Sequence, residues 1–322
     1  MGRALQSFFL GVAVAAMPLG GGQAFAQNDK TIEIVRDFRG KPVTLKSEIF
    51  LPKDAGGKAP AMIILHGSGG VRAMRELAYA RLFSDWGIIA VVTDSFSGRG
   101  ITSTVRDQDQ ISSYDMLVDT AAITQMVARD PRVDPKRIGL IGFSKGGTST
   151  IKAALQSYIV PLAKYEFGFS LLIALYPWCG DMPNDFSPAD SSLYMLLGED
   201  DVYSGTESCR EYAFRLKEAG GNVVLKTYPM AKHDWDVPGP TDWFDARGQN
   251  YSKCIYDEVA NGTWVERGSK ITVRENNKLT GNGPQALARC MTLGVRGGYN
   301  REVHMQSLKD IRGFIRGAFQ LK

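Results

Sequence analysis

The sequence alternates short apolar runs with longer segments of helical periodicity, and this alternation restricts its fold more than any other feature. The apolar runs predict buried strands at 61–65, 88–93, 137–143, 171–176, 193–197 and 223–228. Amphipathic segments predict helices between and after them, at 72–86, 112–128, 147–157, 207–219 and 306–319. Repeated strand–helix–strand units predict an α/β fold, in which helices cover both faces of a mostly parallel central sheet.

Two regions lie outside this pattern. Segments 31–36 and 43–50 alternate apolar and polar residues, which predicts edge strands joined in a hairpin around Arg39 and Gly40. Residues 237–298 are polar, rich in Gly and Asn, and too many for a simple connection. We therefore expect an ordered insertion there, held by a disulfide, within a single domain that spans residues 27–322.

Residues 1–26 have the pattern of a signal peptide. Arg3 supplies a positive start, residues 5–19 are largely apolar, and Ala24-Phe25-Ala26 forms an A-x-A cleavage site. The apolar run is short for a bilayer and is broken by a proline, although a signal anchor is the competing interpretation. No later stretch has the length of a transmembrane helix. We expect a periplasmic or secreted protein with no stable membrane anchor after cleavage.

All four cysteines follow this segment. An even number in an oxidising compartment predicts two disulfides, and four cysteines allow three connectivities. We favour Cys179–Cys209 and Cys254–Cys290, because the members of each pair flank one local piece of chain. The spacing of the cysteines is too wide for a zinc site, so we expect no metal.

The overall composition excludes several classes of protein. A chain that is 44% hydrophobic and 22% charged is neither disordered nor a coiled coil. Its net charge of +4, without any Lys/Arg-rich block, argues against nucleic acid as a partner and fits a small molecule. The oligomeric state leaves no signal in the sequence.

The chemistry is centred on Gly142-Phe143-Ser144-Lys145-Gly146. A G-x-S-x-G string is weak by itself, but here a buried strand precedes it and a helix follows, which predicts Ser144 as a nucleophile. Glycines remove the Cβ atoms that would clash in such a turn, and the helix N-terminus favours negative charge. The alternative is a glycine-rich turn with an incidental serine. No phosphate-binding G-x-x-x-x-G-K-[ST] motif is present, and we expect no cofactor.

A serine nucleophile needs a base, and the sequence has three histidines. Only His233 follows the last predicted strand of the sheet, where the carboxyl edge would receive a base. His66 lies at the end of an earlier strand, in an oxyanion-loop position that favours a structural role. His304 precedes the last predicted helix, where a surface histidine is expected. We therefore predict His233 as the base.

The third member of a triad is a carboxylate on a loop between nucleophile and base. Glu199, Asp200 and Asp201 are the candidates, and the order Ser144, Asp, His233 is typical of α/β-hydrolases. A carboxylate there would hold the imidazole in the right tautomer. Spacing alone does not separate Asp200 from Asp201.

These motifs resemble the dienelactone hydrolase-like branch of the α/β-hydrolase superfamily. The matching pieces follow one another over most of the chain: Leu65-His66-Gly67-Ser68-Gly69-Gly70, Asp94-Ser95-Phe96 with Arg99-Gly100, Gly142-Phe143-Ser144-Lys145-Gly146-Gly147, Tyr176-Pro177-Trp178-Cys179, Gly198-Glu199-Asp200-Asp201 with Cys209, and Tyr228-Pro229 with His233. The resemblance implies the α/β-hydrolase fold, selects Asp201 as the acid and supports the Cys179–Cys209 pair. Dienelactone hydrolases proper carry a cysteine nucleophile, so Ser144 implies a more general serine ester hydrolase.

The expected activity is hydrolysis of small-molecule carboxylic esters through an acyl-enzyme on Ser144. Backbone N–H groups of Ser68 and Lys145 would bind the oxyanion, and the Lys145 side chain would point away. Aromatic residues on loops at the same edge are candidates for a pocket lining: Phe96, Trp178, Tyr203 and Trp235. The alternatives are a serine peptidase of the prolyl-oligopeptidase type and a non-catalytic α/β-hydrolase scaffold.

Overall fold

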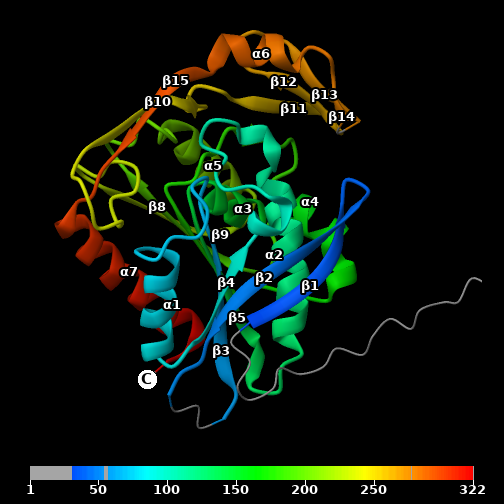
Figure 1. The fold of residues 1–322 in the computed structure, drawn as a ribbon. Coiled ribbons are helices and arrows are strands. Elements are labelled where there is room, and N and C mark those ends of the chain that lie inside the picture. Colours follow the sequence, from blue (N-terminus) through cyan, green and yellow to red (C-terminus); the bar gives the residue numbers. More distant parts are fainter. Residues whose placement is uncertain (1–30, 54–56, 277, 322) are drawn as a thin grey trace, which may run out of the picture.

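A twisted, mostly parallel sheet runs through the centre of the molecule (Figure 1). The computed structural model describes residues 31–53, 57–276 and 278–321, so the signal peptide predicted at 1–26 lies outside the described residues. The strands of this sheet are β1 (Thr31–Phe38), β2 (Lys41–Phe50), β3 (Ala59–Leu65), β4 (Ile89–Asp94), β5 (Val133–Phe143), β6 (Leu171–Leu175), β8 (Ser192–Gly198) and β9 (Asn222–Tyr228).

The order of strands across the sheet is β1-β2-β4-β3-β5-β6-β8-β9. β1 and β2 form the predicted hairpin, and β2 is also antiparallel to β4. All other neighbours are parallel, as the strand–helix alternation predicts. The prediction of a mostly parallel central sheet is therefore confirmed.

Helices cover both faces of this sheet. Apolar side chains of α1 (Glu76–Asp85) and α7 (Arg301–Phe319) pack on one face. Those of α2 (Ser113–Ala128), α3 (Lys145–Lys152) and α5 (Glu207–Glu218) pack on the other. Shorter helices lie in the connections: η1 (Ser97–Arg99), η2 (Gln108–Gln110), α4 (Gln156–Ile159) and η3 (Val160–Tyr165).

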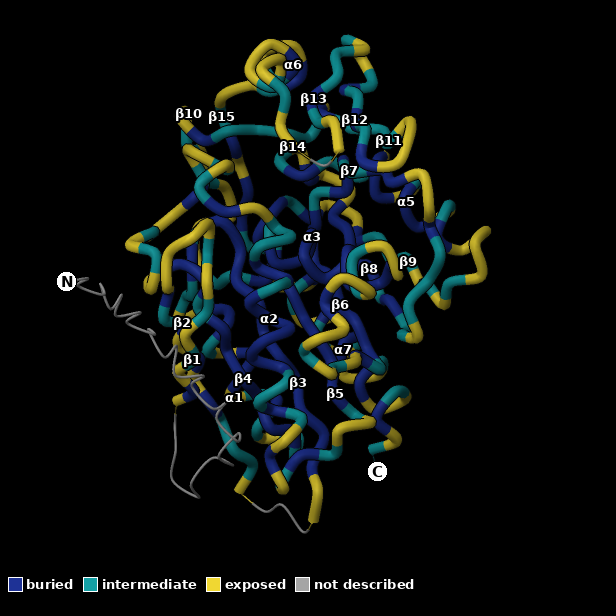
Figure 2. The backbone as a smooth tube through the Cα atoms, turned by 90° about the vertical axis from the view of Figure 1, so that its right-hand side faces the viewer, coloured by how far each residue is buried: buried dark blue, intermediate teal, exposed yellow. Residues whose placement is uncertain are grey.

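The core explains why the strand sequences are continuously apolar. In β3 every residue is buried, and successive side chains point to opposite faces. Ile63 joins the cluster under α2, whereas Met62 and Ile64 join the cluster under α1 and α7. Figure 2 shows the central strands as buried tube, with the exposed segments outside them.

The segment predicted as an insertion is ordered and forms two small sheets beyond the carboxyl edge of the central sheet (Figure 1). One pairs β10 (Trp243–Asn250) with β15 (Thr292–Gly297). The other contains β11 (Tyr256–Ala260), β12 (Thr263–Glu266), β13 (Thr272–Glu275) and β14 (Lys278–Leu279), and α6 (Gly283–Cys290) follows it. β7 (Asp181–Met182), from the β6–β8 connection, pairs with β11. This shared sheet supports our proposal that the insertion belongs to a single domain.

The disulfides join Cys179 to Cys209 and Cys254 to Cys290, the two pairs that sequence proximity favours. The first ties the chain after β6 to α5, and the second ties the connection between β10 and β11 to the end of α6. Two disulfides indicate a protein of an oxidising compartment. Within residues 31–53, 57–276 and 278–321, no helix is long and apolar enough to cross a membrane.

Several predicted helix boundaries are wrong. The helix predicted at 72–86 begins only at Glu76. The helix predicted at 147–157 divides into α3 and α4, because Leu155 leaves the helix and forms a β-bridge with Pro188. The last helix starts at Arg301 instead of 306, because the Asn300 side chain caps it by accepting a hydrogen bond from Val303 N.

Candidate active site

Ser144 occupies a tight turn between β5 and α3, at the carboxyl edge of the central sheet. Its φ of 52° and ψ of −115° are strained for a residue with a side chain. The turn needs glycine on both sides, since a Cβ on Gly142 would lie 2.1 Å from the Gly146 carbonyl oxygen. A Cβ on Gly146 would lie 2.6 Å from the carbonyl oxygen of Leu65. The nucleophile turn therefore packs directly against the end of β3.

A chain of hydrogen bonds runs from Ser144 to a buried carboxylate. His233 Nε2 lies 3.0 Å from Ser144 Oγ, and His233 Nδ1 lies 2.8 Å from Asp201 Oδ2. A carboxylate only accepts, so Nδ1–H donates to Asp201 and Nε2 accepts from the serine hydroxyl. The three predicted residues come from the β5–α3 turn, the loop after β8 and the loop after β9, and the fold brings them together.

Asp201 faces the imidazole, whereas the Asp200 side chain is exposed. Asp201 Oδ1 accepts hydrogen bonds from the backbone N–H groups of Tyr203 and Ser204, each at 2.9 Å. These bonds orient the carboxylate and leave Oδ2 for His233. The geometry thus distinguishes two carboxylates that sequence spacing leaves equivalent.

The His233 ring is enclosed between two tyrosines. The rings of Tyr176 and Tyr203 have their centroids 4.7 Å and 4.6 Å from the imidazole. Burial is the largest single influence and lowers the pKa of His233. The charge of Asp201, its hydrogen bond and the charge of Asp234 together outweigh burial, so the pKa lies above its usual 6.5. The site is therefore built to stabilise an imidazolium once the ring takes a proton.

An ion-pair network joins the loop of the base to the segment after β3. Asp234 accepts hydrogen bonds from Arg75 Nη1 at 2.7 Å and from Arg72 Nη1 at 2.9 Å. Arg75 and Asp234 are buried, and Asp234 has φ 60°. Burial favours the neutral acid, but the arginines hold the pKa of Asp234 below its usual range. This network was not predicted from the sequence, although the position of Asp234 next to His233 was an available signal.

The loop after β3 carries the predicted oxyanion donor. His66 Nδ1 lies 2.8 Å from Gly67 O, and His66 Nε2 accepts from Ser95 N at 3.2 Å, which gives this histidine a structural role. A Cβ on Gly67 would lie 3.2 Å from the Ser144 Cβ, so the loop touches the nucleophile. The Ser68 carbonyl accepts from Thr104 N at 2.8 Å, which orients that part of the loop.

The Lys145 side chain points away from Ser144, and it has a partner of its own. Its Nζ donates to the carbonyl oxygens of Gln108 and Ile111, both at 2.7 Å. Burial lowers the pKa of Lys145 to about 8. The lysine therefore anchors the η2 segment beside the nucleophile turn, a contact that the motif did not predict.

The aromatic candidates divide into two groups. Phe96 and Trp235 are buried at 2% and 0% exposure, and Trp235 Nε1 donates to Ser307, so both belong to the core. Tyr203 covers His233, and Trp178 contacts the insertion, where its Nε1 donates to Tyr251 O at 2.8 Å. Only these two of the four remain candidates for a pocket lining.

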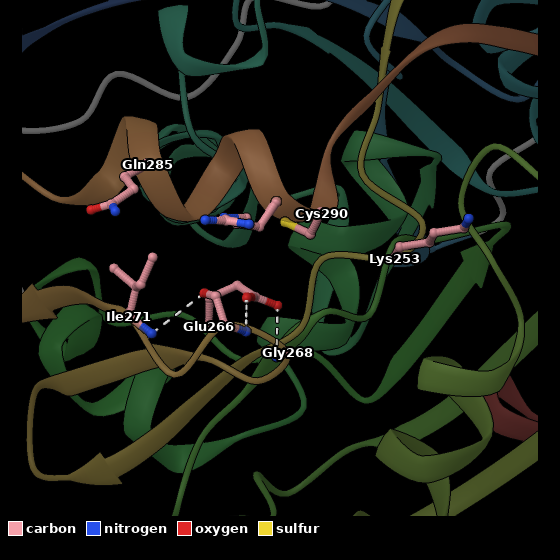
Figure 3. A pocket seen from close by; sticks show the side chains of 8 residues that line it. Lys253, Glu266, Gly268, Ile271, Gln285 and Cys290 are labelled. Carbon is pink, nitrogen blue, oxygen red and sulfur yellow. Dashed lines mark hydrogen bonds between the residues drawn. The ribbon is translucent and has the colours of Figure 1, made fainter.

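Two hollows on the described surface contain none of the triad residues. The larger, of about 640 Å³, lies in the insertion between α6 and the β12–β13 turn (Figure 3). Its Glu266 carboxylate accepts from the backbone N–H groups of Gly268 and Ser269, so it stabilises its own turn. The smaller, of about 500 Å³, lies between Met230 and the start of α7. Among the described residues, no group of three His, Cys, Asp or Glu side chains could hold a metal ion.

Residues 45–254 match the model of the dienelactone hydrolase family. The chain belongs to this family. The matched range contains Ser144, Asp201 and His233, and it ends at Cys254, so most of the insertion lies beyond it. Lactones are cyclic carboxylic esters, and this family member is a carboxylic ester hydrolase. No curated protein matches the sequence.

Solved structures with the same fold include a thermophilic esterase from the Planctomycetes species Thermogutta terrifontis. It is 16% identical, with a TM-score of 0.50 over 64% of this chain and 84% of that one. A second structure of this esterase, called esterase 2, in which it is phosphorylated by paraoxon, is 17% identical, with a TM-score of 0.51 over 65% and 86% of the chains. A protein assigned as a dienelactone hydrolase from Klebsiella pneumoniae is also 17% identical, with a TM-score of 0.50 over 64% and 88%. At these identities the likeness shows the fold alone.

Proposed function

We propose that this dienelactone hydrolase family member cleaves carboxylic esters of small molecules through an acyl-enzyme on Ser144. The observation that carries the proposal is the continuous chain of hydrogen bonds from Asp201 Oδ2 through His233 to Ser144 Oγ, at 2.8 and 3.0 Å. The strained serine turn is the second support, since it presents the hydroxyl at the sheet edge. No metal or other cofactor takes part in the proposed reaction.

The proposed reaction follows from these contacts. Ser144 Oγ attacks the ester carbonyl carbon while His233 Nε2 takes the hydroxyl proton, and Asp201 stabilises the resulting imidazolium. His233 then returns the proton to the alkoxide oxygen as the carbon–oxygen bond breaks, so that an alcohol leaves and the acyl group stays on Ser144. A water molecule deprotonated by the same nitrogen then attacks the acyl carbon. His233 returns this proton to Ser144 Oγ as the bond between Oγ and the acyl carbon breaks, which releases the acid and restores the serine.

Two backbone N–H groups are proposed to bind the oxyanion that forms during attack. One is that of Lys145, the first residue of α3, where the helix N-terminus also favours negative charge. The other is that of Ser68, in the loop that touches Ser144. Each such donor lowers the barrier by about 3–4 kcal/mol.

Two other functions make different predictions. A serine peptidase of the prolyl-oligopeptidase type would use the same triad, but membership of the dienelactone hydrolase family favours esters. A non-catalytic scaffold would not need the Ser144, His233 and Asp201 side chains in hydrogen-bonded order.

The proposed location is the periplasm or the extracellular space. The disulfides Cys179–Cys209 and Cys254–Cys290 support it, because such bonds persist in oxidising compartments. Mass spectrometry of the protein expressed with its own N-terminal segment tests it. Cleavage after Ala26 in the exported fraction is expected, and an uncleaved cytosolic product would refute it.

Kinetics with two substrate series test the function. We expect p-nitrophenyl esters of short acids to be turned over faster than p-nitroanilide peptides, and Ser144→Ala to lose the activity. Ser157→Ala, at an exposed serine, is the matched control. Thermogutta terrifontis esterase 2 is phosphorylated by paraoxon, so paraoxon should add mass to the wild type and not to Ser144→Ala. Faster amide cleavage would favour the peptidase, and an unlabelled, inactive wild type would favour the scaffold.

A further inference from the structure

A closed series of contacts, a ring, starts at Ser144 and returns to it. From Ser144, the first contact is His233 Nε2 at 3.0 Å, and the Tyr203 ring lies over His233 at 4.6 Å between centroids. Tyr203 OH accepts from Gln108 Nε2 at 3.4 Å, and Gln108 Oε1 accepts from Ser68 Oγ at 3.1 Å. The loop of Ser68 then returns to the nucleophile turn, against which it packs. The sequence-based predictions name the other members of this ring but not Gln108.

The two ends of the Gln108 side-chain amide contact different loops. Its Oε1 accepts hydrogen bonds from the hydroxyls of Ser68, at 3.1 Å, and Thr104, at 3.4 Å. The Nε2 group, which only donates, lies 3.4 Å from the Tyr203 hydroxyl. Each end of the amide thus holds a different loop: the oxyanion loop at the oxygen and the loop of the triad acid at the nitrogen.

The backbone of Gln108 is held as firmly as its side chain. Its N–H donates to Gln249 Oε1 of β10 at 2.8 Å, and its carbonyl oxygen accepts from Lys145 Nζ at 2.7 Å. The backbone N–H of Gln249 donates to Val105 O at 2.9 Å, so β10 makes two hydrogen bonds to the segment that contains Val105 and Gln108. The insertion and the nucleophile turn together fix the position from which the Gln108 side chain reaches across the site.

We propose that Gln108 is a positioning residue, which keeps the oxyanion loop and the tyrosine that covers the base at a fixed separation across Ser144. The proposal rests on the proposed ester hydrolysis at Ser144. During attack, the carbonyl oxygen must reach the oxyanion donors while His233 takes the proton, so an error in this separation affects the transition state more than substrate binding. Gln108 itself forms no bond to the ester.

Gln108→Leu keeps a side chain of similar size and removes its three hydrogen bonds, to Ser68, Thr104 and Tyr203. We expect kcat on a p-nitrophenyl ester to fall by about tenfold or more, with KM within about threefold, because the loss is in orientation. Gln156→Leu, at an exposed glutamine of α4, is the matched control and should leave both constants unchanged. Thermal unfolding of each variant shows whether the fold is intact.

Tyr203→Phe provides a second variant that keeps the ring on His233 and removes only the hydroxyl. Since Gln108 acts in part through this hydroxyl, we expect a smaller fall in kcat, of about threefold. The double variant should be no slower than Gln108→Leu, because the shared bond can be lost only once.

The outcomes separate this inference from the function on which it rests. If Ser144→Ala keeps the esterase activity, the proposed function fails. If Ser144→Ala is inactive but Gln108→Leu keeps kcat within about twofold of wild type, the positioning role is refuted. A Gln108→Leu enzyme that changes only in KM would also refute it. So would effects of Gln108→Leu and Tyr203→Phe that multiply in the double variant, since independent contacts are additive in free energy.

Discussion

Replacing Lys145 with methionine should change how the stability of the protein depends on pH. The ammonium group is buried beside the nucleophile turn, where its Nζ donates to two carbonyl oxygens. Burial lowers the pKa of Lys145 to about 8 in the folded protein. An unfolded chain gives lysine a pKa of about 10.4. The folded state therefore releases this proton at a lower pH than the unfolded state does.

The sign of the effect follows from proton linkage. Between these two pKa values the unfolded state binds more protons, so the wild type gains stability as the pH rises. Below pH 7 both states hold the proton, and the full cost of burying the charge is present. Between pH 7 and about 9.5 the wild type should gain about 2 kcal/mol from this group, out of about 3 kcal/mol over the whole range. Lys145→Met has no proton to release and should lack this gain.

Urea unfolding of both proteins at pH 7, 8 and 9.5 measures the effect. The difference in free energy of unfolding between wild type and Lys145→Met should move by about 2 kcal/mol in favour of the wild type, while other titrating groups cancel in the comparison. Lys309→Met, at an exposed lysine of α7, is the control and should show a constant difference. A constant difference for Lys145→Met as well would refute the reasoning.

Three further predictions concern the site and the insertion. The acid limb of the kcat/KM profile should have its midpoint above pH 6.5, because His233 must be neutral to act as base. Asp201→Asn should lower kcat by about 10⁴-fold and shift this limb to lower pH. An acid limb that does not shift would contradict the role of Asp201. Replacing Cys254 and Cys290 with serine should destabilise the fold by up to about 4 kcal/mol, because their separation of 36 positions closes a long loop; an unchanged midpoint in thermal unfolding contradicts this. Gly146→Ala should separate the nucleophile turn from β3, because its Cβ would lie 2.6 Å from Leu65 O. The rate of paraoxon labelling of Ser144 should then fall by more than about tenfold, which corresponds to a rise of more than about 1.4 kcal/mol in the barrier. Labelling at the wild-type rate would contradict this.

The parts of this molecule that could be predicted from sequence are those that depend on local pattern. Continuous apolar runs such as 61–65 predict strands buried on both faces, and β3 is buried along its whole length. The serine turn was predictable because it needs glycine at 142 and 146. Backbone atoms approach these two positions too closely for a larger residue. Chain order then placed a carboxylate and His233 at the same sheet edge, since parallel strands end on one side.

The parts that could not be predicted depend on contacts between distant segments. Asp201, and not Asp200, accepts hydrogen bonds from the backbone N–H groups of Tyr203 and Ser204. This difference depends on the folded conformation of the loop. The strands of the insertion were hidden because segments such as Thr263–Glu266 are short, and their pairing is fixed by neighbours, one of which, β7, lies far earlier in the chain.

Gln108 is the clearest example of this limit. Nothing in its local sequence marks it, because a glutamine in a polar loop usually faces solvent. Beyond Thr104 nearby in the chain, its role arises from partners in four separate segments: Ser68, Tyr203, Gln249 and Lys145. One of these, Gln249, belongs to β10 of the insertion, in the part that the family match still covers. The insertion is therefore connected to the catalytic geometry through Gln108, and substitutions in β10 at Gln249 should affect kcat through the same residue.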